Sequence, residues 1–205
     1  MGIPVNIVGL NKFIKEIPDG NIILLEGKID PVKTFFVEHI GCTAVKNGRD
    51  VVYIASRVID EIKEELFEYN SDTKSFNIIE ERSSRHWKDY IKNNSLLIVD
   101  SFSYLMLDKS LYEFRDNLED LRQVIKEKNS IVLLTVEEGM LDEKAEVTAK
   151  YLADGIIIFK KKETSKGISR YVIIPKWKNN MAFNDNIYYD FDGCNMKVDM
   201  RSRVV

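Results

Sequence analysis

The stretch "LLEGKIDPVKTFF", residues 24–36, decides the fold, because apolar residues typical of a buried strand lead directly into a phosphate-loop pattern. The standard pattern is G-x-x-x-x-G-K-[ST], and Gly27, Lys33 and Thr34 stand at its spacing. Val32 occupies the place of the second glycine. The stretch predicts a strand, an altered phosphate-binding loop and a following helix that we expect to be amphipathic.

The residues inside this loop oppose its usual task. Working loops bind phosphate with consecutive backbone N–H groups and a helix N-terminus, while Lys meets the β- and γ-phosphates and Ser or Thr holds magnesium. Pro31 removes one N–H donor, and Val32 would be strained by about 1–3 kcal/mol at positive φ. Asp30 adds a negative charge, with a repulsion of about 3 kcal/mol at roughly 5 Å.

Length and composition indicate one soluble α/β domain. The 205 residues suit a single domain over 1–205, with a tail from about 192–205 that we expect to be loosely ordered. Hydrophobic residues make up 44% and charged residues 31%, and no apolar run reaches membrane-spanning length. The start, MGIPVNIVGL, carries neither a basic leader nor a lipidation pattern, so we expect a cytoplasmic location.

Charge and rare residues exclude several kinds of site. A net charge of -3 does not favour nucleic acid as a partner. Cys42 and Cys194 are too few and too distant for a metal knuckle or a disulfide framework, and we expect both to be small fillers. His39 and His86 are too few for a histidine-rich metal site, and we expect surface or packing roles for them.

Short apolar runs alternate with helical patterns along most of the chain. The runs read as buried strands at 21–26, 50–56, 75–80, 95–101, 130–136 and 155–160. A helical pattern joins Val58, Ile62 and Leu66. A longer helix is predicted to have one apolar face made of Leu111, Phe114, Leu118, Leu121 and Ile125. This alternation predicts a parallel sheet covered by helices.

After residue 154 the pattern changes to an antiparallel hairpin. Two strand-like runs, 155–163 and 168–178, are joined by a short turn that contains Gly167, and one more strand is expected near 187–189. An aromatic-rich end consists of Trp177, Phe183, Tyr188, Tyr189 and Phe191. These rings could stack on bases, but neighbouring aspartates repel phosphates, so packing or a partner surface is the favoured interpretation.

A second acid-bearing strand completes a candidate nucleotide site. The run 95–101 ends close to Asp100, and in sites of this layout such an acid ligates magnesium through water. The candidate cofactor-binding residues are therefore Gly27, Lys33, Thr34 and Asp100. Thr34 and Asp100 would contact Mg if nucleotide binds.

Taken together, the chain resembles the KaiC-like branch of the RecA superfamily of ATPases from about residue 15 to 180. The matching segments are GNIILLEGKIDPVKTFF (20–36), VVYIASRV (51–58), SLLIVDSFSYL (95–105), YLADGIIIFKKKE (151–163) and PKWK (175–178). The resemblance implies a RecA-like P-loop NTPase fold. Its mostly parallel central sheet would be flanked by helices and end in a C-terminal antiparallel hairpin.

The departures from this family concern catalysis. The family's paired glutamates, which polarise the attacking water, fall at Arg57 and Val58, and neither residue accepts a proton. Asp60 and Glu61 lie about one helical turn further on and are expected to point elsewhere. We therefore assign no catalytic residue and do not expect efficient hydrolysis.

Members of this family commonly form hexameric rings with nucleotide between subunits. Lys176 and Lys178 match the basic segment through which a neighbour contacts that nucleotide, so they are candidate inter-subunit contacts. The alternative is that both are solvated lysines at a strand end.

The loop residues also have a purely structural interpretation. Lys33 would then pair with Asp30, Thr34 would cap the helix, and Asp100 would hydrogen-bond the loop or Thr34. Weak nucleotide or phosphate binding is the competing interpretation.

The first functional hypothesis is a regulatory or assembly module, a pseudo-ATPase with a degenerate loop whose binding of ATP and Mg is weak or absent. Its partner would be another protein or further copies of itself. The alternative is a slow ATPase completed by oligomer or partner subunits. A DNA recombination or repair paralogue ranks third, because the acidic balance disfavours DNA.

Overall fold

A computed structural model describes residues 2–68, 76–81, 87–165, 167–178, 183–193 and 195–199. His86, Cys194 and the tail beyond residue 199 lie outside this part of the chain, as does the side chain of Phe183.

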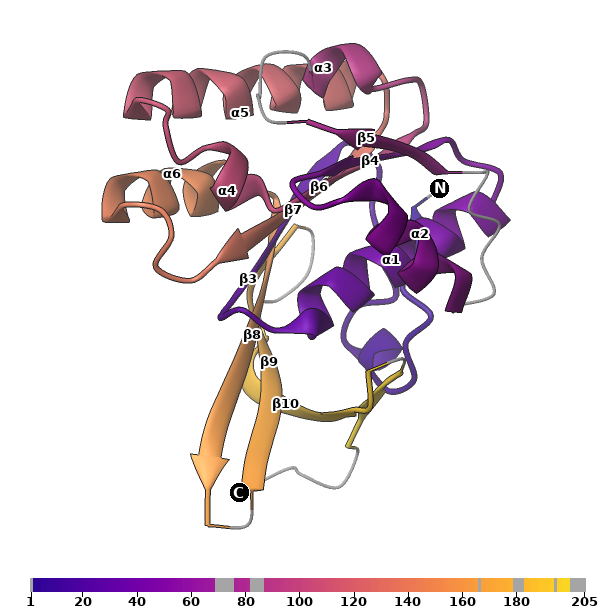
Figure 1. Cartoon of the computed structure of the whole chain (residues 1–205), viewed down its shortest axis with the longest axis vertical. Helices are drawn as coiled ribbons and strands as arrows, with labels where there is room; N and C mark the ends of the chain where they lie inside the picture. Colours follow the sequence, from indigo (N-terminus) through magenta and orange to yellow (C-terminus); the bar gives the residue numbers. More distant parts are fainter. Residues whose placement is uncertain are drawn as a thin grey trace.

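The described residues form a nine-stranded sheet with the order β11-β10-β9-β8-β3-β7-β6-β4-β5 (Figure 1). Its parallel strands are β3 (Asn21–Gly27), β4 (Val51–Ala55), β5 (Phe76–Glu80), β6 (Leu96–Asp100), β7 (Ile131–Glu137) and β8 (Gly155–Thr164). Antiparallel pairing then adds β9 (Gly167–Trp177), β10 (Phe183–Phe191) and β11 (Met196–Val198). The predicted mostly parallel sheet with a C-terminal antiparallel hairpin is confirmed.

The strands are apolar throughout because both faces of the sheet are covered. Alternate residues of a strand point to opposite faces. In β3, Ile23 and Leu25 belong to one buried cluster, whereas Ile22 and Leu24 belong to the other. Continuous apolar runs, rather than an alternation of apolar and polar residues, are therefore what this sheet requires.

Helices cover the two faces of the sheet unequally. One face carries α1 (Pro31–Lys46) and α2 (Ile59–Glu68). The other carries α3 (Trp87–Tyr90), α4 (Phe102–Leu105), α5 (Leu111–Glu127) and α6 (Glu143–Leu152). Figure 1 shows these two groups on opposite sides of the strands. None of the helices in the described ranges is long and apolar enough to cross a bilayer.

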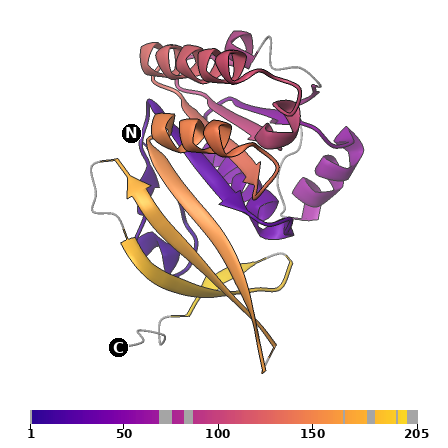
Figure 2. The ribbon, with the colours of Figure 1, turned by 90° about the vertical axis from the view of Figure 1, so that its left-hand side faces the viewer.

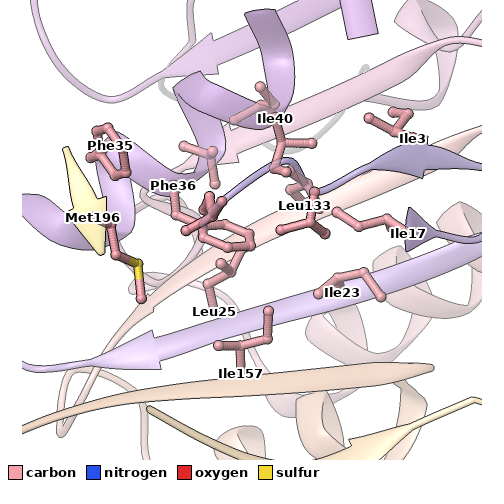
Figure 3. Packing of buried hydrophobic residues seen from close by; sticks show 14 of the residues in the cluster. Ile3, Ile17, Ile23, Leu25, Phe35, Phe36, Ile40, Leu133, Ile157 and Met196 are labelled. Atoms are coloured by element: carbon pink, nitrogen blue, oxygen red, sulfur yellow. The ribbon is translucent and has the colours of Figure 1, made fainter. Parts of the chain in front are cut away.

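Helix α1 is buried on nearly all sides, so the prediction of an amphipathic helix is wrong. A second layer covers its outer surface, built from β1 (Ile3–Pro4), the 3-10 turn η1 (Leu10–Lys12), β2 (Glu16–Ile17) and β11. Figure 3 shows residues of this layer and of the sheet packed around Phe36 and Ile40. Cys42 in the same helix is buried, as expected of a small filler.

Helix α5 follows its predicted apolar face with one exception. Phe114, Leu118, Leu121 and Ile125 are buried, but Leu111 is 40% exposed. Leu111 is the first residue after the N-cap Ser110, which forms a capping box with Glu113, and it therefore lies at the outer end of the helix.

The β8–β9 hairpin extends beyond the rest of the molecule, as Figure 2 shows. Rings of the aromatic-rich end pack inward: Tyr189 lies edge-on to Phe159 at 6.3 Å, and Phe191 lies 5.3 Å from Phe35. Within the tail, Val198 of β11 donates its N–H to the carbonyl of Val8. The two ends of the described chain therefore contact each other.

Candidate functional site

The carboxyl ends of four parallel strands meet at one edge of the sheet. Gly27 at the end of β3 pairs with Glu137 of β7, and Ala55 of β4 pairs with Asp100 of β6. Ligands of open α/β sheets bind at this edge. A pocket of about 390 Å³ opens there, lined by Ile29, Asp30, Pro31, Thr34, Phe35, Glu38, Ser56, Arg57, Glu65, Asp100, Ser101, Glu137 and Gly193.

The Lys33 side chain is buried beside this pocket and fully engaged within the chain. Its ammonium group donates to a carboxylate oxygen of Glu137 at 3.1 Å. It also donates to the backbone carbonyls of Lys28 at 2.6 Å and Gly27 at 3.4 Å. The predicted pairing of Lys33 with Asp30 is therefore wrong, because the acid at the end of β7 lies closer to the ammonium group.

Asp30, and not Thr34, caps helix α1. The Asp30 carboxylate accepts the N–H of Val32 at 3.1 Å and pairs with the Lys161 ammonium group at 2.6 Å. Burial alone would raise the pKa of Asp30, but the hydrogen bonds from Lys161 and Val32 outweigh it and lower the pKa. A carboxylate of the chain itself thus lies at the positive end of the helix, where an anion would bind.

The loop does not wrap around a phosphate-sized space. Helix α1 begins at Pro31, two residues before Lys33, so Val32 is already helical. Positive φ angles at non-glycine residues are confined, within the described part of the chain, to Asn6, Asn94 and Asn129. The expected backbone strain at Val32 is absent because the loop has become a short, capped connection.

Asp100 is surrounded by hydroxyl groups. One of its carboxylate oxygens accepts from Thr135 at 2.6 Å, and the other accepts from Tyr53 at 2.7 Å and from Thr34 at 3.1 Å. The predicted hydrogen bond between Thr34 and Asp100 is confirmed. Burial, together with the charge of Asp100, raises the pKa of Tyr53 well above its usual value, so this hydroxyl remains a donor.

Arg57 lies at the pocket in the position where the resemblance places a catalytic glutamate. Its guanidinium group forms two 3.0 Å hydrogen bonds to the carboxylate of Glu65 in α2, and one nitrogen lies 3.7 Å from Glu38. Asp60 points away from the pocket, with an 85% exposed side chain paired to Lys63. This position therefore holds a cation that is paired with acids rather than a proton acceptor.

Glu38 is the most unusual acid of the site. It is 1% exposed, and neither carboxylate oxygen has a hydrogen-bond partner among the described residues. Burial and the nearby charge of Glu65 raise the pKa of Glu38 to about 9, although Arg57 acts in the opposite direction. Glu38 is therefore protonated near neutral pH and can donate its hydrogen to Glu65.

Sequence reasoning missed Glu38, Glu65 and Glu137 as pocket residues. Glu38 did carry a signal, since an acid directly after the apolar run from Phe35 to Val37 is unusual in a buried helix. Glu137 is the last residue of β7, a strand that was predicted to end one residue earlier. Glu65 had no signal, because it lies on a helix whose polar face is rich in acids.

Lys176 and Lys178 contact helix α6 and the connection between α6 and β8 rather than the pocket. The Lys176 ammonium group donates to the carbonyls of Lys150 and Tyr151 at 3.1 and 2.9 Å. Lys178 lies 3.4 Å from Asp154. Both have partners within the chain, and their assignment as inter-subunit contacts stays a prediction.

The donor set of the pocket fits magnesium and ATP poorly. The lysine is paired with an acid, the first helical residue is a proline, and the strand-end aspartate already accepts three hydroxyl groups. The described residues contain no cluster of three or more His, Cys, Asp or Glu side chains that could hold a metal ion. Binding would therefore require these contacts to be exchanged.

Comparisons with known proteins agree with the fold. A KaiC-like protein, PH0186, from Pyrococcus horikoshii OT3 has a TM-score of 0.79 at 18% identity over 97% of this chain and 99% of its own. The flagellar accessory protein FlaH from Methanocaldococcus jannaschii has a TM-score of 0.78 at 16% identity over 97% of this chain and 98% of its own. No curated protein matches the sequence. Residues 17–204 match a protein family described as a family of unknown function, DUF7125.

Proposed function

The chain belongs to DUF7125, a family of unknown function, and we propose that it is a KaiC-like module of RecA fold that does not hydrolyse ATP efficiently. It acts in regulation or assembly, as a pseudo-ATPase that binds ATP and magnesium weakly or not at all.

The engagement of Lys33 carries this proposal. A phosphate-binding lysine must present its ammonium group to the β- and γ-phosphates. Here Lys33 is 1% exposed, and its ammonium group binds Glu137 and two backbone carbonyls. A phosphate would have to displace the carboxylate of Glu137 and then lie beside its negative charge. Nucleotide affinity is lowered by both effects.

The catalytic side of the pocket supports the same proposal. Arg57 stands in place of a general base and is itself held by Glu65. Asp60 is directed into solvent. The two positions that match the family's paired glutamates therefore offer no group that accepts a proton from water.

The protein would act through its surfaces, in the cytoplasm, on a protein partner or on further copies of itself. One structural neighbour is described as a flagellar accessory protein, and that description fits a RecA-like fold in an accessory role. The third candidate, a DNA recombination or repair paralogue, gains no support from the acidic pocket.

Isothermal titration with ATP plus magnesium tests the proposal. We expect no saturable heat below millimolar ATP, both for the natural chain and for Lys33→Ala. Lys160→Ala is the matched control, because Lys160 forms an exposed ion pair with Glu138 in the turn after β7. Micromolar binding that Lys33→Ala abolishes and Lys160→Ala retains would contradict the proposal.

The slow-ATPase alternative rests on one specific observation. Thr34, Asp100 and Glu137 line one pocket with Lys33 beside it, so a partner subunit could complete the site. This alternative predicts ATP turnover that increases more than linearly with protein concentration and is lost in Lys33→Ala. Turnover that stays at background at every protein concentration would exclude it.

A further inference from the structure

We propose that this pocket binds an organic cation, a guanidinium or ammonium group, through Glu38 and Glu65. The inference concerns the same pocket as the proposed function and rests on its conclusion that magnesium ATP does not occupy the pocket tightly.

The first argument for a cation site is the charge of the pocket lining. The lining contains one cationic side chain, Arg57, and five carboxyl groups: Asp30, Glu38, Glu65, Asp100 and Glu137. Three of these acids are occupied by the chain itself, through Lys161, the three hydroxyl groups around Asp100, and Lys33. Glu65 is also paired, with Arg57, but its side chain is 41% exposed, and Glu38 accepts no hydrogen bond from the described residues, so these two acids have capacity for a further donor. The lining is therefore hostile to a polyanion and suited to a cation.

The second argument is that the buried oxygens of Glu38 accept no hydrogen bond from the residues that the structure describes. A carboxyl group that is 1% exposed is expected to have hydrogen-bond partners, because leaving buried polar atoms unpaired is costly. Yet neither Glu38 oxygen accepts a hydrogen bond within the described part of the chain, and its ion pair with the Arg57 guanidinium is long, at 3.7 Å. When Glu38 is protonated and donates to Glu65, its other oxygen still lacks a donor. A ligand N–H group would satisfy it.

Glu65 supplies the outer half of the site. Its side chain is 41% exposed, and Arg57 approaches both of its oxygens from one side. Each carboxylate oxygen accepts more than one hydrogen bond, so Glu65 can take a second donor without releasing Arg57. A planar guanidinium group, with five N–H donors, suits two neighbouring carboxyl groups better than a single-point ammonium group does.

The rim of the pocket suits the apolar stem of such a ligand. Ile29 lines the pocket and is 82% exposed. Long basic side chains and alkylamines lay their methylene groups on surfaces of this kind while the charged head binds acids.

Binding should release a proton. Burial raises the pKa of Glu38 to about 9, and the groups facing it are Glu65 from α2, Arg57 and Tyr53 from the β4 region, and Asp100 from β6. A bound cation would favour the ionised carboxylate and displace its proton to the buffer. The affinity should therefore rise as pH increases toward 9, by up to about tenfold per pH unit.

Titration with methylguanidinium chloride tests the inference, with N-methylurea as the uncharged ligand of matched shape. We expect a dissociation constant of about 1 mM or tighter for methylguanidinium at pH 8. Titrations in two buffers of different ionisation enthalpy should reveal the release of about one proton. N-methylurea should not bind.

Two variants and one control assign the binding to the pocket. Glu38→Gln keeps the size and neutral charge of protonated Glu38, so it should fold, but it should weaken methylguanidinium binding at least about tenfold and abolish proton release. Glu65→Gln should also weaken binding. Glu64→Gln, an exposed neighbour on the same helix, should change nothing.

The outcomes separate this inference from the proposed function. Equal binding of methylguanidinium and N-methylurea, or methylguanidinium binding that Glu38→Gln leaves intact, would overturn the cation site alone. Tight binding of magnesium ATP would overturn the proposed function, and the inference with it. A lack of binding by both ligands and by ATP would overturn only the inference.

The source of the cation is distinguished by two further probes. Acetyl-Gly-Arg-Gly-amide presents a guanidinium group as a protein side chain does. Spermidine presents ammonium groups on a small metabolite. Tighter binding of the peptide than of its citrulline counterpart and of spermidine supports a partner protein's arginine. The reverse order supports a small polyamine, and failure of both probes would overturn the inference.

Discussion

At the scale of single residues, most charged side chains in and beside the pocket are paired within the chain. Lys33 pairs with Glu137, and Arg57 pairs with Glu65, in each case across different structural elements. Removing one partner of a buried pair leaves a charge without compensation, which costs more than the pair contributes. Glu38 differs, because its ion pair with Arg57 is long, at 3.7 Å, and neither of its oxygens accepts a hydrogen bond from the described residues, so burial raises its pKa and keeps it neutral.

The Lys33 pair makes a stability prediction. Glu137→Gln should lower the free energy of unfolding by about 1–3 kcal/mol, because the side chains of Lys33 and Glu137 are only 2% and 18% exposed. The neighbouring substitution Glu138→Gln breaks an exposed pair with Lys160 and should cost about 0.5 kcal/mol or less. Urea denaturation at pH 7 measures both, and equal effects would contradict the assigned importance of the buried pair.

Glu38 makes a prediction about pH. Its pKa in the folded protein is raised to about 9, above the ordinary value of 4.5, so the folded state holds its proton more tightly than the unfolded state does. Stability contributed by this proton is complete below about pH 4.5 and declines as pH rises toward 9. Glu38→Gln should therefore gain stability over the natural chain as pH rises from 5 to 9, by up to about 5 kcal/mol.

The measurement is chemical denaturation at pH 5, 7 and 9. Glu64→Gln is the control, since Glu64 is exposed on α2 and should show the same pH dependence as the natural chain. A Glu38→Gln difference that does not grow with pH would show that Glu38 is already ionised near neutrality.

At the scale of elements, the start of α1 determines what the loop can do. A helix that begins at Pro31 and is capped by Asp30 has its first turn occupied by the chain's own carboxylate. The three residues between β3 and α1 are too few to curl around a phosphate and still meet this cap. The position at which α1 begins, and not the missing glycine alone, therefore prevents the loop from wrapping around a phosphate.

The cap can be tested by substitution. Asp30→Ala should lower the free energy of unfolding by about 1–2 kcal/mol, because it removes the N-cap and the pair with Lys161. Asp30→Asn retains a capping oxygen and should lose less. Since the pKa of Asp30 is lowered, the difference between the natural chain and Asp30→Ala should shrink as pH falls below about 4. Similar losses at pH 3 and pH 7 would argue against the ionised cap.

At the scale of the whole molecule, the chain's two ends jointly enclose α1. The N-terminal segment lies over the helix, where Val5 accepts a hydrogen bond from His39, and β11 pairs with Val8 through Val198. The sheet thus has its usual two covering layers plus a third layer over α1. This extra layer makes the helix that follows the loop, and hence the pocket wall, part of the core.

A glycine at this junction tests the coupling of the ends. Gly9 has φ of 85°, and a Cβ atom there would lie 2.7 Å from Cβ of Val198. Gly9→Ala should therefore lower the free energy of unfolding by about 2–4 kcal/mol. Gly139→Ala is the control, because Gly139 has φ of 81° but nothing within 4 Å, so only backbone strain of about 1 kcal/mol remains. Equal losses in the two variants would contradict the close packing of the ends.

The sequence by itself determined the strands, the hairpin and the class of fold. Continuous runs of Ile, Val and Leu need two covered faces, and the spacing of Gly27, Lys33 and Thr34 places a loop and helix after the first such run. It also placed Asp100 near Thr34, since both follow strands that end at the same edge. These are local or nearly local patterns, which a single sequence can carry.

Only the tertiary structure decided which partner each charge has. Lys33 meets Glu137 across 104 positions of the chain, and Glu38 is buried because residues from both ends cover α1. The strength of an ion pair and the protonation of an acid depend on distance and burial, and neither is written in the spacing of nearby residues. The same motif residues could therefore belong to a loop that binds phosphate or to one whose lysine and helix cap are occupied by the chain itself. The packing of distant segments selects the second.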